Sequence, residues 1–217
     1  MNQKQILYST LALLGLFGTL YIVYKLIGGG PNESLITKIK SEKPAERTLW
    51  NREATHTLTV FSDYQCPACK IFHEYLSSME ASASPNISIT QKVSYVFRYF
   101  PLYQIHEHAF SLVYAAEAAG RQGKFKEISD RFFADQIRLE TVKDINPYLI
   151  EVAADLKLNN KQFITDMKDK ALQSVVQNDL ALEDGLGINA TPTFYLDGEK
   201  LENISPADLL KLLKELK

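Results

Sequence analysis

The sequence predicts an α/β domain that follows an N-terminal membrane-spanning helix. Residues 6–27 form one apolar run of the length that crosses a bilayer. Beyond it, short runs rich in β-branched residues alternate with segments of helical periodicity. The chain of 217 residues is long enough for one domain with a real core plus an appendage. Its formal net charge is -2, so the chain lacks the excess of basic residues typical of nucleic-acid-binding proteins, and we expect no nucleic-acid partner.

The apolar run carries a single charged residue, Lys25, near its C-terminal end. At about 1.5 Å per residue, roughly twenty residues cover the ~30 Å hydrocarbon core. A cleaved signal peptide usually has an apolar run of only about 7–15 residues, followed by a small-residue cleavage site. Because no such site is clear before Gly28, we expect residues 1–28 to be an uncleaved anchor. A cleaved signal sequence is the alternative.

The charges around the span leave its orientation open. Lys38, Lys40 and Lys43 follow the span and Lys4 precedes it. The positive-inside rule alone would therefore place the following domain in the cytoplasm, but long domains translocate largely regardless of such charges. The cysteine chemistry considered below favours an extracytoplasmic domain on a single-pass protein of the cell membrane.

The remaining chain divides into a tether and one domain. Residues 29–54 are polar and of mixed charge, and we expect a linker there. The folded domain is expected over residues 55–217. Its elements are expected in this order: a strand at 55–63, a helix at 67–81, a strand at 87–100, helices within about 102–185, a hairpin turning at Asp197-Gly198, and a helix from Pro206. This order inserts a helical run into a small βαβ…ββα core.

Both cysteines of the chain lie in "FSDYQCPACKIFHEY", residues 61–75. A structural zinc site needs four ligands, whereas Cys66, Cys69 and His73 supply at most three, and the other histidines form no matching pair. We therefore expect no metal. A purely structural disulfide would enclose only the two residues between the cysteines, so it would restrict the unfolded chain very little.

A redox-active thiol pair has a better physical basis. Cys66 follows the first strand and stands at a helix start, with Pro67 at the position where a missing N–H costs nothing. The unpaired amides and the helix dipole favour a thiolate at Cys66. Cys69 lies one turn further on, within reach of a disulfide with Cys66. Far along the chain, the Thr191-Pro192 bond precedes the hairpin strand, where either a cis bond or an ordinary trans proline fits.

Three stretches run in the order of a known family: "FSDYQCPACKIFHE", "VFRYFPLYQIHEHAFSLVYAAEAAGRQGKF" and "TPTFYLDGEKL". With them the chain resembles the DsbA-like thiol-disulfide oxidoreductases of the thioredoxin superfamily, in particular the membrane-anchored bacterial kind. The resemblance implies a thioredoxin fold with an inserted helical domain, preceded by an N-terminal transmembrane helix. It also implies that Cys66 is the nucleophile and Cys69 the resolving thiol, that Pro192 is a cis-proline beside them, and that Thr191 offers backbone hydrogen bonds to a substrate strand.

Some residues near these stretches need separate expectations. The dipeptide between the cysteines is Pro67-Ala68, where the strongest oxidants of the family carry Pro-His, so we expect a less depressed pKa at Cys66. Asp63 is expected to cap the local turn, with tuning of Cys66 as the alternative. His106 and His108 are expected to pack and cap near a helix start rather than to bind a ligand.

The resemblance implies an enzyme that introduces or exchanges disulfides in extracytoplasmic proteins, with the Cys66–Cys69 disulfide and no other cofactor. Its expected partners are reduced or misoxidised extracytoplasmic proteins and a membrane quinone-linked re-oxidase, and we expect a monomer. Two alternatives stay open. One is a disulfide reductase or isomerase kept reduced by a transmembrane donor. The other is a non-catalytic, membrane-anchored peptide-binding domain of chaperone type.

Overall fold

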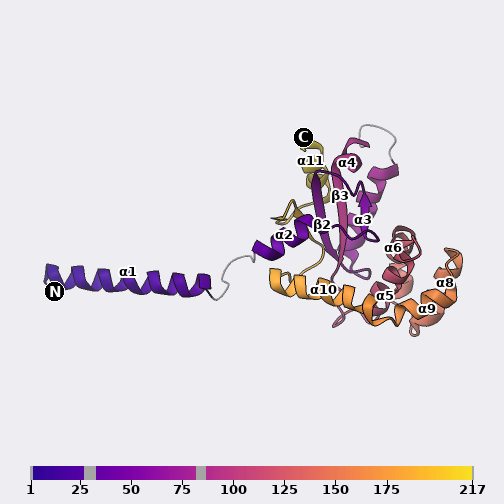
Figure 1. Cartoon of the computed structure of the whole chain (residues 1–217), viewed down its shortest axis with the longest axis horizontal. Coiled ribbons are helices and arrows are strands. Elements are labelled where there is room, and N and C mark those ends of the chain that lie inside the picture. The colour runs from indigo at the N-terminus through magenta and orange to yellow at the C-terminus, as the bar shows by residue number, and fades with distance from the viewer. Residues whose placement is uncertain (1, 27–32, 82–86, 217) are drawn as a thin grey trace.

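The computed structural model describes residues 2–26, 33–81 and 87–216 (Figure 1). One mixed sheet of five strands has the order β1-β3-β2-β4-β5. Strand β2 pairs in parallel with β3, and the other neighbouring strands are antiparallel. The strands are β1 (Thr48–Trp50), β2 (His56–Ser62), β3 (Val93–Tyr99), β4 (Thr193–Leu196) and β5 (Glu199–Leu201).

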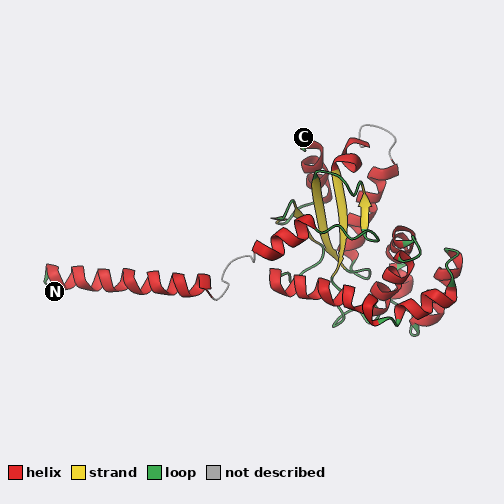
Figure 2. Cartoon of the chain, in the orientation of Figure 1, coloured by secondary structure: helices red, strands yellow, loops and turns green. Residues whose placement is uncertain are grey.

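Helices surround this sheet, as the red and yellow elements of Figure 2 show. Six of the described helices, α5 to α10, lie between β3 and β4 in the chain, where the sequence predicts a helical insertion. The helices are α1 (Gln3–Leu26), α2 (Glu33–Ser41), α3 (Pro67–Ala81), α4 (Ile87–Lys92), α5 (Ala109–Gly120), α6 (Phe125–Ala134), α7 (Gln136–Leu139), α8 (Ile145–Asp155), α9 (Asn160–Met167), α10 (Lys170–Leu186) and α11 (Pro206–Glu215).

Both faces of the sheet are covered, because side chains alternate between the faces along each strand. On one face, Leu58 and Val60 of β2 belong to the large core together with apolar residues of α3 and α11. On the other face, Phe61 packs in a second, smaller core with Ile39 of α2 and residues of α10. Strand β2 is therefore buried on both faces from Thr57 to Ser62, and it places small polar side chains such as Thr57 and Thr59 in the interior beside the apolar ones.

Residues 33–54 differ from the expected linker. Helix α2 buries Ile39 completely, and β1 pairs with β3 in the sheet. Arg47, between them, is only 3% exposed. A composition typical of a tether therefore belongs here to part of the domain. The expected linker residues 29–32 lie outside the described residues.

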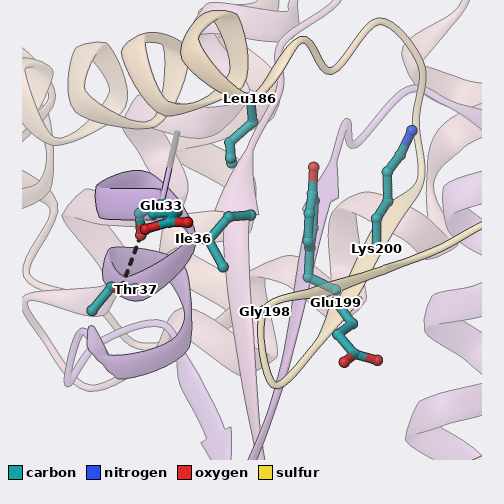
Figure 3. Close-up of a pocket in the computed structure, with 8 residues that line it drawn as sticks. Glu33, Ile36, Thr37, Leu186, Gly198, Glu199 and Lys200 are labelled. Atoms are coloured by element: carbon teal, nitrogen blue, oxygen red, sulfur yellow. Dashed lines mark hydrogen bonds between the residues drawn. The ribbon is translucent and has the colours of Figure 1, made fainter. Parts of the chain in front are cut away.

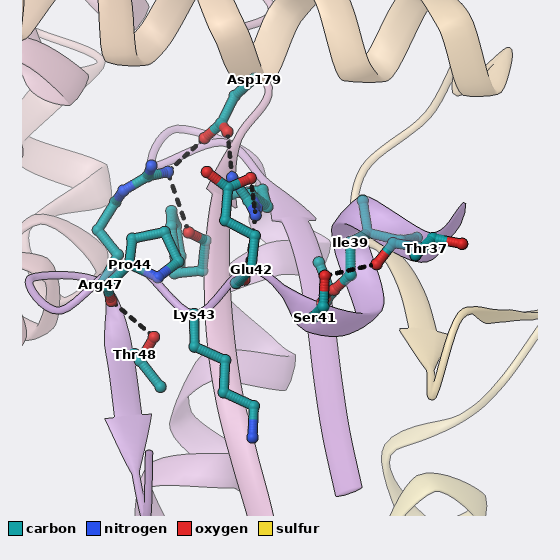
Figure 4. A network of polar contacts seen from close by, with 12 residues as sticks. Thr37, Ile39, Ser41, Glu42, Lys43, Pro44, Arg47, Thr48 and Asp179 are labelled. Carbon is teal, nitrogen blue, oxygen red and sulfur yellow. Dashed lines mark hydrogen bonds and ion pairs between the residues drawn. The ribbon is translucent and has the colours of Figure 1, made fainter. Parts of the chain in front are cut away.

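A buried network of charges holds this segment in place (Figure 4). Asp179 of α10 is fully buried and pairs with Arg47 and, at 3.0 Å, with Nη1 of Arg98 on β3. Nε of Arg47 also lies 2.6 Å from the carboxylate of Glu117 on α5. The network therefore connects the N-terminal segment, the sheet and two helices of the insertion.

The expected strand at 87–100 begins later than predicted. Residues 87–92 form α4, and β3 starts at Val93. Every residue of β3 is buried, whereas in α4 Ile89 is buried and Gln91 and Lys92 are exposed. Only the second part of the stretch belongs to the sheet.

Helix α1 contains the predicted membrane span. Residues Gln3–Tyr24 are long and apolar enough to cross a bilayer, and none of their surface is buried against the rest of the described chain. This property rests on length and composition and is shared by signal sequences.

Candidate active site

The first cysteine follows the C-terminal end of β2, the middle strand of the sheet. The strand ends at Ser62, and helix α3 begins at Pro67. The carbonyl of Cys66 accepts the amide of Lys70 at 3.2 Å, so Cys66 stands at the cap position of α3. Proline suits the next position because its missing N–H would have no partner in the helix. The local sequence thereby places a thiol at the positive end of a helix.

The two thiols have opposite electrostatics. Both cysteines are free; Cys66 is 7% exposed and Cys69 is 2% exposed. A hydrogen bond with the Cys69 thiol lowers the pKa of Cys66 to about 6 against the effect of burial, with further contributions from Thr191 and from the backbone amides of Cys69 and Ala68. Burial, and then the neighbouring Cys66, raise the pKa of Cys69 well above its usual value. Cys66 is therefore the thiol that ionises first.

The distant proline lies at the same place. The Thr191-Pro192 bond is cis, and the Cys66 thiol donates to the carbonyl of Thr191 at 3.6 Å. These residues meet because β4 runs beside β2, with Thr193 opposite Phe61 in the register. The structure thus brings together the cysteine pair and the Thr191-Pro192 bond.

A cavity of about 370 Å³ lies beside Pro192. Its apolar wall includes Phe72 of α3 and Phe194 of β4, whose rings lie 4.8 Å apart, and Ile204 completes it. The polar residues that border the same space are Asn189, Thr193, Lys200, Glu202 and Asn203. An extended peptide with one apolar side chain matches such a mixture of surfaces.

A larger cleft of about 700 Å³ lies elsewhere, between α2 and the β4–β5 hairpin (Figure 3). Figure 3 shows Ile36 of α2 and Leu186 of α10 directed toward this space. The cleft adjoins the smaller core, on the sheet face opposite α3. Its lining contains no cysteine or histidine. Neither cavity is lined by a cysteine, but the smaller one includes Pro192, whose neighbour Thr191 accepts a hydrogen bond from the Cys66 thiol.

Asp63, three residues before Cys66, acts as a structural acceptor. It is 1% exposed, and its carboxylate accepts the amides of Gln65 and Leu102, each at 2.7 Å. Nδ1 of His106 lies 2.9 Å from the same carboxylate. The expected capping role agrees with these contacts, and the expected packing role of His106 does as well.

The remaining histidines near the site are also engaged in the fold. Nε2 of His108 donates to the carbonyl of Val142 at 2.7 Å. His73 lies 2.7 Å from Asp130 and stacks on Phe133, with ring centroids 4.3 Å apart. Within residues 2–26, 33–81 and 87–216, no group of three or more potential ligands could hold a metal ion.

Sequence reasoning missed Gln136 of the helical insertion. This residue is 6% exposed, and its side-chain amide donates to the carbonyls of Tyr64 at 2.7 Å and Cys66 at 2.9 Å. No sequence feature of a glutamine seventy residues away from Cys66 indicates such a contact. Only the packing of α7 against the β2–α3 junction reveals it.

The sheet order, the helical insertion and the thiol pair at a helix start beside a cis-proline define a thioredoxin-like fold. A family model described as thioredoxin matches residues 42–215. The chain therefore belongs to the thioredoxin family. The match begins at residue 42, which agrees with the finding that residues before 55 are part of the domain.

Two solved structures are similar to the chain in fold, and one of them is described as a thiol-disulfide exchange protein. Alpha-DsbA2 from Wolbachia pipientis has a TM-score of 0.67 at 16% identity, over 85% of this chain and 97% of that chain. Oxidised BdbD from Bacillus subtilis has a TM-score of 0.64 at 19% identity, over 81% and 96% of the two chains. At these identities the likeness concerns the fold.

A curated relative is named as an antiporter. Na(+)/H(+) antiporter NhaA 1 of Mycolicibacterium gilvum is 30% identical over 167 residues, which is 76% of this chain and 25% of that protein. The chain thus spans about a quarter of the length of the curated relatives that it matches.

Proposed function

We propose that the chain is a membrane-tethered thiol-disulfide oxidoreductase that introduces or exchanges disulfides in extracytoplasmic proteins. The observation that carries the proposal is the contrast between two adjacent thiols beside Pro192: the pKa of Cys66 is about 6 and that of Cys69 is raised. A readily ionised thiol next to a thiol that stays protonated matches the division between nucleophile and resolving group.

The reaction balances with the two cysteines alone. In the oxidised protein, a substrate thiolate attacks Sγ of Cys66, and the bond to Cys69 breaks. The electron pair leaves on Cys69, which takes up a proton because its pKa is high. A second substrate thiolate then attacks the substrate sulfur of the mixed disulfide, and Cys66 leaves as a thiolate. The substrate loses two electrons and gains a disulfide, while the protein ends as the dithiol.

The contacts around Pro192 support a place for the substrate. The carbonyl of Thr191 faces Cys66, and the next residue, Pro192, borders the cavity lined by Phe72 and Phe194. An extended substrate segment that pairs with the Thr191 backbone would bring its cysteine to Cys66, since edge pairing supplies main-chain hydrogen bonds without sequence preference.

An oxidising compartment suits disulfide formation, so we place the domain outside the cytoplasm. Helix α1 would hold it at the membrane, where a quinone-linked membrane protein would re-oxidise the dithiol. The proposed protein acts as a monomer on reduced or misoxidised proteins, with the Cys66–Cys69 disulfide as its only redox group.

A reductase is the second candidate, and one observation favours it. The Cys66 pKa of about 6 lies nearer to the value of about 7 in a reductant such as thioredoxin than to about 3.5 in the strongest oxidant. Ala68 supplies no charge to the thiolate, in agreement with the expectation of a moderate pKa. In this candidate, a transmembrane donor keeps the pair reduced and the same steps run in reverse.

The test uses the full-length chain and a reduced peptide with two cysteines. Oxidised wild-type protein should convert the peptide to its disulfide, and Cys66→Ser should abolish the conversion. Cys69→Ser should accumulate a mixed disulfide between Cys66 and the peptide. If the double Cys66→Ser, Cys69→Ser variant supports the same cellular role as the wild type, the catalytic proposal is wrong and a non-catalytic peptide-binding role replaces it.

A further inference from the structure

The loop that carries the nucleophile is held by the helical insertion. Between β2 and α3, the hydroxyl of Tyr64 lies 2.8 Å from that of Ser129 on α6, and the side-chain oxygen of Gln65 accepts the amide of His108 at 3.0 Å. These two contacts hold the side chains of Tyr64 and Gln65 in place. Gln136 differs from them, because it binds the backbone on either side of Gln65.

Gln136 makes two hydrogen bonds from one amide group. Its Nε2 donates to the carbonyl oxygens of Tyr64 and Cys66 and has two protons to give. Among the described residues, no backbone amide donates to the Tyr64 carbonyl. A buried carbonyl without a partner costs free energy, so loss of Gln136 would favour a rotation of this peptide group toward another donor.

The orientation of these peptide groups matters because dipoles dominate the thiolate environment. The groups that favour the charged form of Cys66 are the Cys69 thiol, Thr191 and the amides of Cys69 and Ala68, all of them uncharged. A neutral dipole stabilises an anion only while its positive end faces the anion. The amides of Cys69 and Ala68 at the β2–α3 junction therefore contribute to the stability of the thiolate, after the Cys69 thiol and Thr191.

We propose that Gln136 is a positioning residue for the nucleophile: by holding the carbonyls of Tyr64 and Cys66 against α7, it keeps the amides at the start of α3 directed at the Cys66 sulfur. The inference rests on the proposed function. It means that the helical insertion affects the reactivity of Cys66, because Gln136 of α7 acts on the Cys66 sulfur through the backbone and not by direct contact.

The test is a titration of the thiolate by its ultraviolet absorbance in the reduced, full-length protein. Gln136→Met keeps a similar side-chain length and removes both donors, so the midpoint should rise from about 6 by roughly half to one pH unit. Gln136→Glu places an ionisable acceptor against two carbonyls, and its midpoint should rise further. The matched control is Ser129→Ala, which removes the buried partner of Tyr64 and should lower the melting temperature without moving the midpoint.

The outcomes distinguish the positioning role of Gln136 from the proposed function. A wild-type midpoint near 6 with an unchanged midpoint in Gln136→Met would overturn the positioning role alone. A wild-type protein without any thiol that titrates near 6 would contradict the proposed function itself. An equal shift in Ser129→Ala would show that any loosening of the loop suffices, and this result also overturns the specific role of Gln136.

A measurement on the wild-type chain covers the case in which the variants do not fold. The side-chain amide protons of Gln136 should be protected from solvent exchange, and their NMR shifts should follow the ionisation of Cys66 through the bonded carbonyl. Rapid exchange, or shifts that do not change across pH 6, would contradict the proposal.

Discussion

The carboxylate of Asp63 and the imidazole of His106 form a buried contact, with 2.9 Å between Oδ1 and Nδ1. This contact joins the end of β2 to the segment before α5, so it fastens the nucleophile loop to the start of the helical insertion. Asp63 also accepts two backbone amides, so three contacts hold its carboxylate in the loop. Its function in the structure is to hold the loop.

Asp63→Asn should therefore separate stability from reactivity. The amide retains one acceptor oxygen and turns a donor toward a backbone N–H, which should lower the free energy of unfolding by about 1–3 kcal/mol. The alkylation midpoint of Cys66 should stay near 6. Chemical denaturation and iodoacetamide kinetics measure the two quantities, and a large change in the midpoint at unchanged stability would indicate a tuning role instead.

The buried charges around Arg47 predict that residues before 55 are essential to the fold. Arg47→Ala leaves Asp179 and Glu117 with fewer partners, and the loss of one member of a buried ion pair costs about 3–5 kcal/mol. Arg138→Ala is the matched control: it removes a bidentate pair with Glu151 at 2.7 Å, in which both side chains are 44% exposed, and should lower the stability much less because solvent screens the pair. Similar losses in both variants by urea denaturation would support the linker interpretation.

The lowered pKa of Cys66 sets a pH dependence with a defined sign. In the reduced protein, the alkylation rate should rise with pH and level off above about 7, with a midpoint near 6. The folded pKa lies below the unfolded value of about 8.5, so ionisation stabilises the fold. This contribution is complete above the unfolded value and is lost as the pH falls through 6.

The ionisation of Cys66 also predicts a trend in melting temperature. The difference between the reduced wild type and Cys66→Ser should grow in favour of the wild type from pH 5 to pH 8. A difference that stays constant over this range would mean that Cys66 titrates as an ordinary thiol.

The proposed topology predicts which side of the membrane carries the thiols. A membrane-impermeant maleimide added to intact cells after mild reduction should label Cys66. The control is Asn2→Cys in a chain that also carries Cys66→Ser and Cys69→Ser, whose cysteine precedes α1 and should be labelled only after lysis. The reverse pattern would place the domain in the cytoplasm, as the lysines after the span suggest.

The sequence predicts the parts of this fold that depend on local chemistry. The helix from Pro67, the hairpin turn at Asp197-Gly198, where both residues have positive φ, and the cap of α11 by Ser205 agree with the structure. Each depends on residues that are neighbours in the chain. Cys66 was recognisable because its flanking proline and strand lie in the same short stretch.

Features that depend on distant partners could not be predicted in this way. Residues 33–54 resemble a linker because their charges are visible in the sequence and the partners of those charges are not. Arg47 becomes a core residue only when α5 and α10 bring Glu117 and Asp179 to it. Gln136 likewise gains its significance only from the packing of α7 on the nucleophile loop.

The equilibrium of the Cys66–Cys69 pair with glutathione tests the central claim most directly. The account predicts a reversible intramolecular disulfide with a reduction potential between those of thioredoxin and the strongest oxidant, about -270 and -120 mV. A pair that forms no intramolecular disulfide, or one with a potential below about -300 mV as in structural disulfides, would contradict the claim that these cysteines exchange disulfides with other proteins.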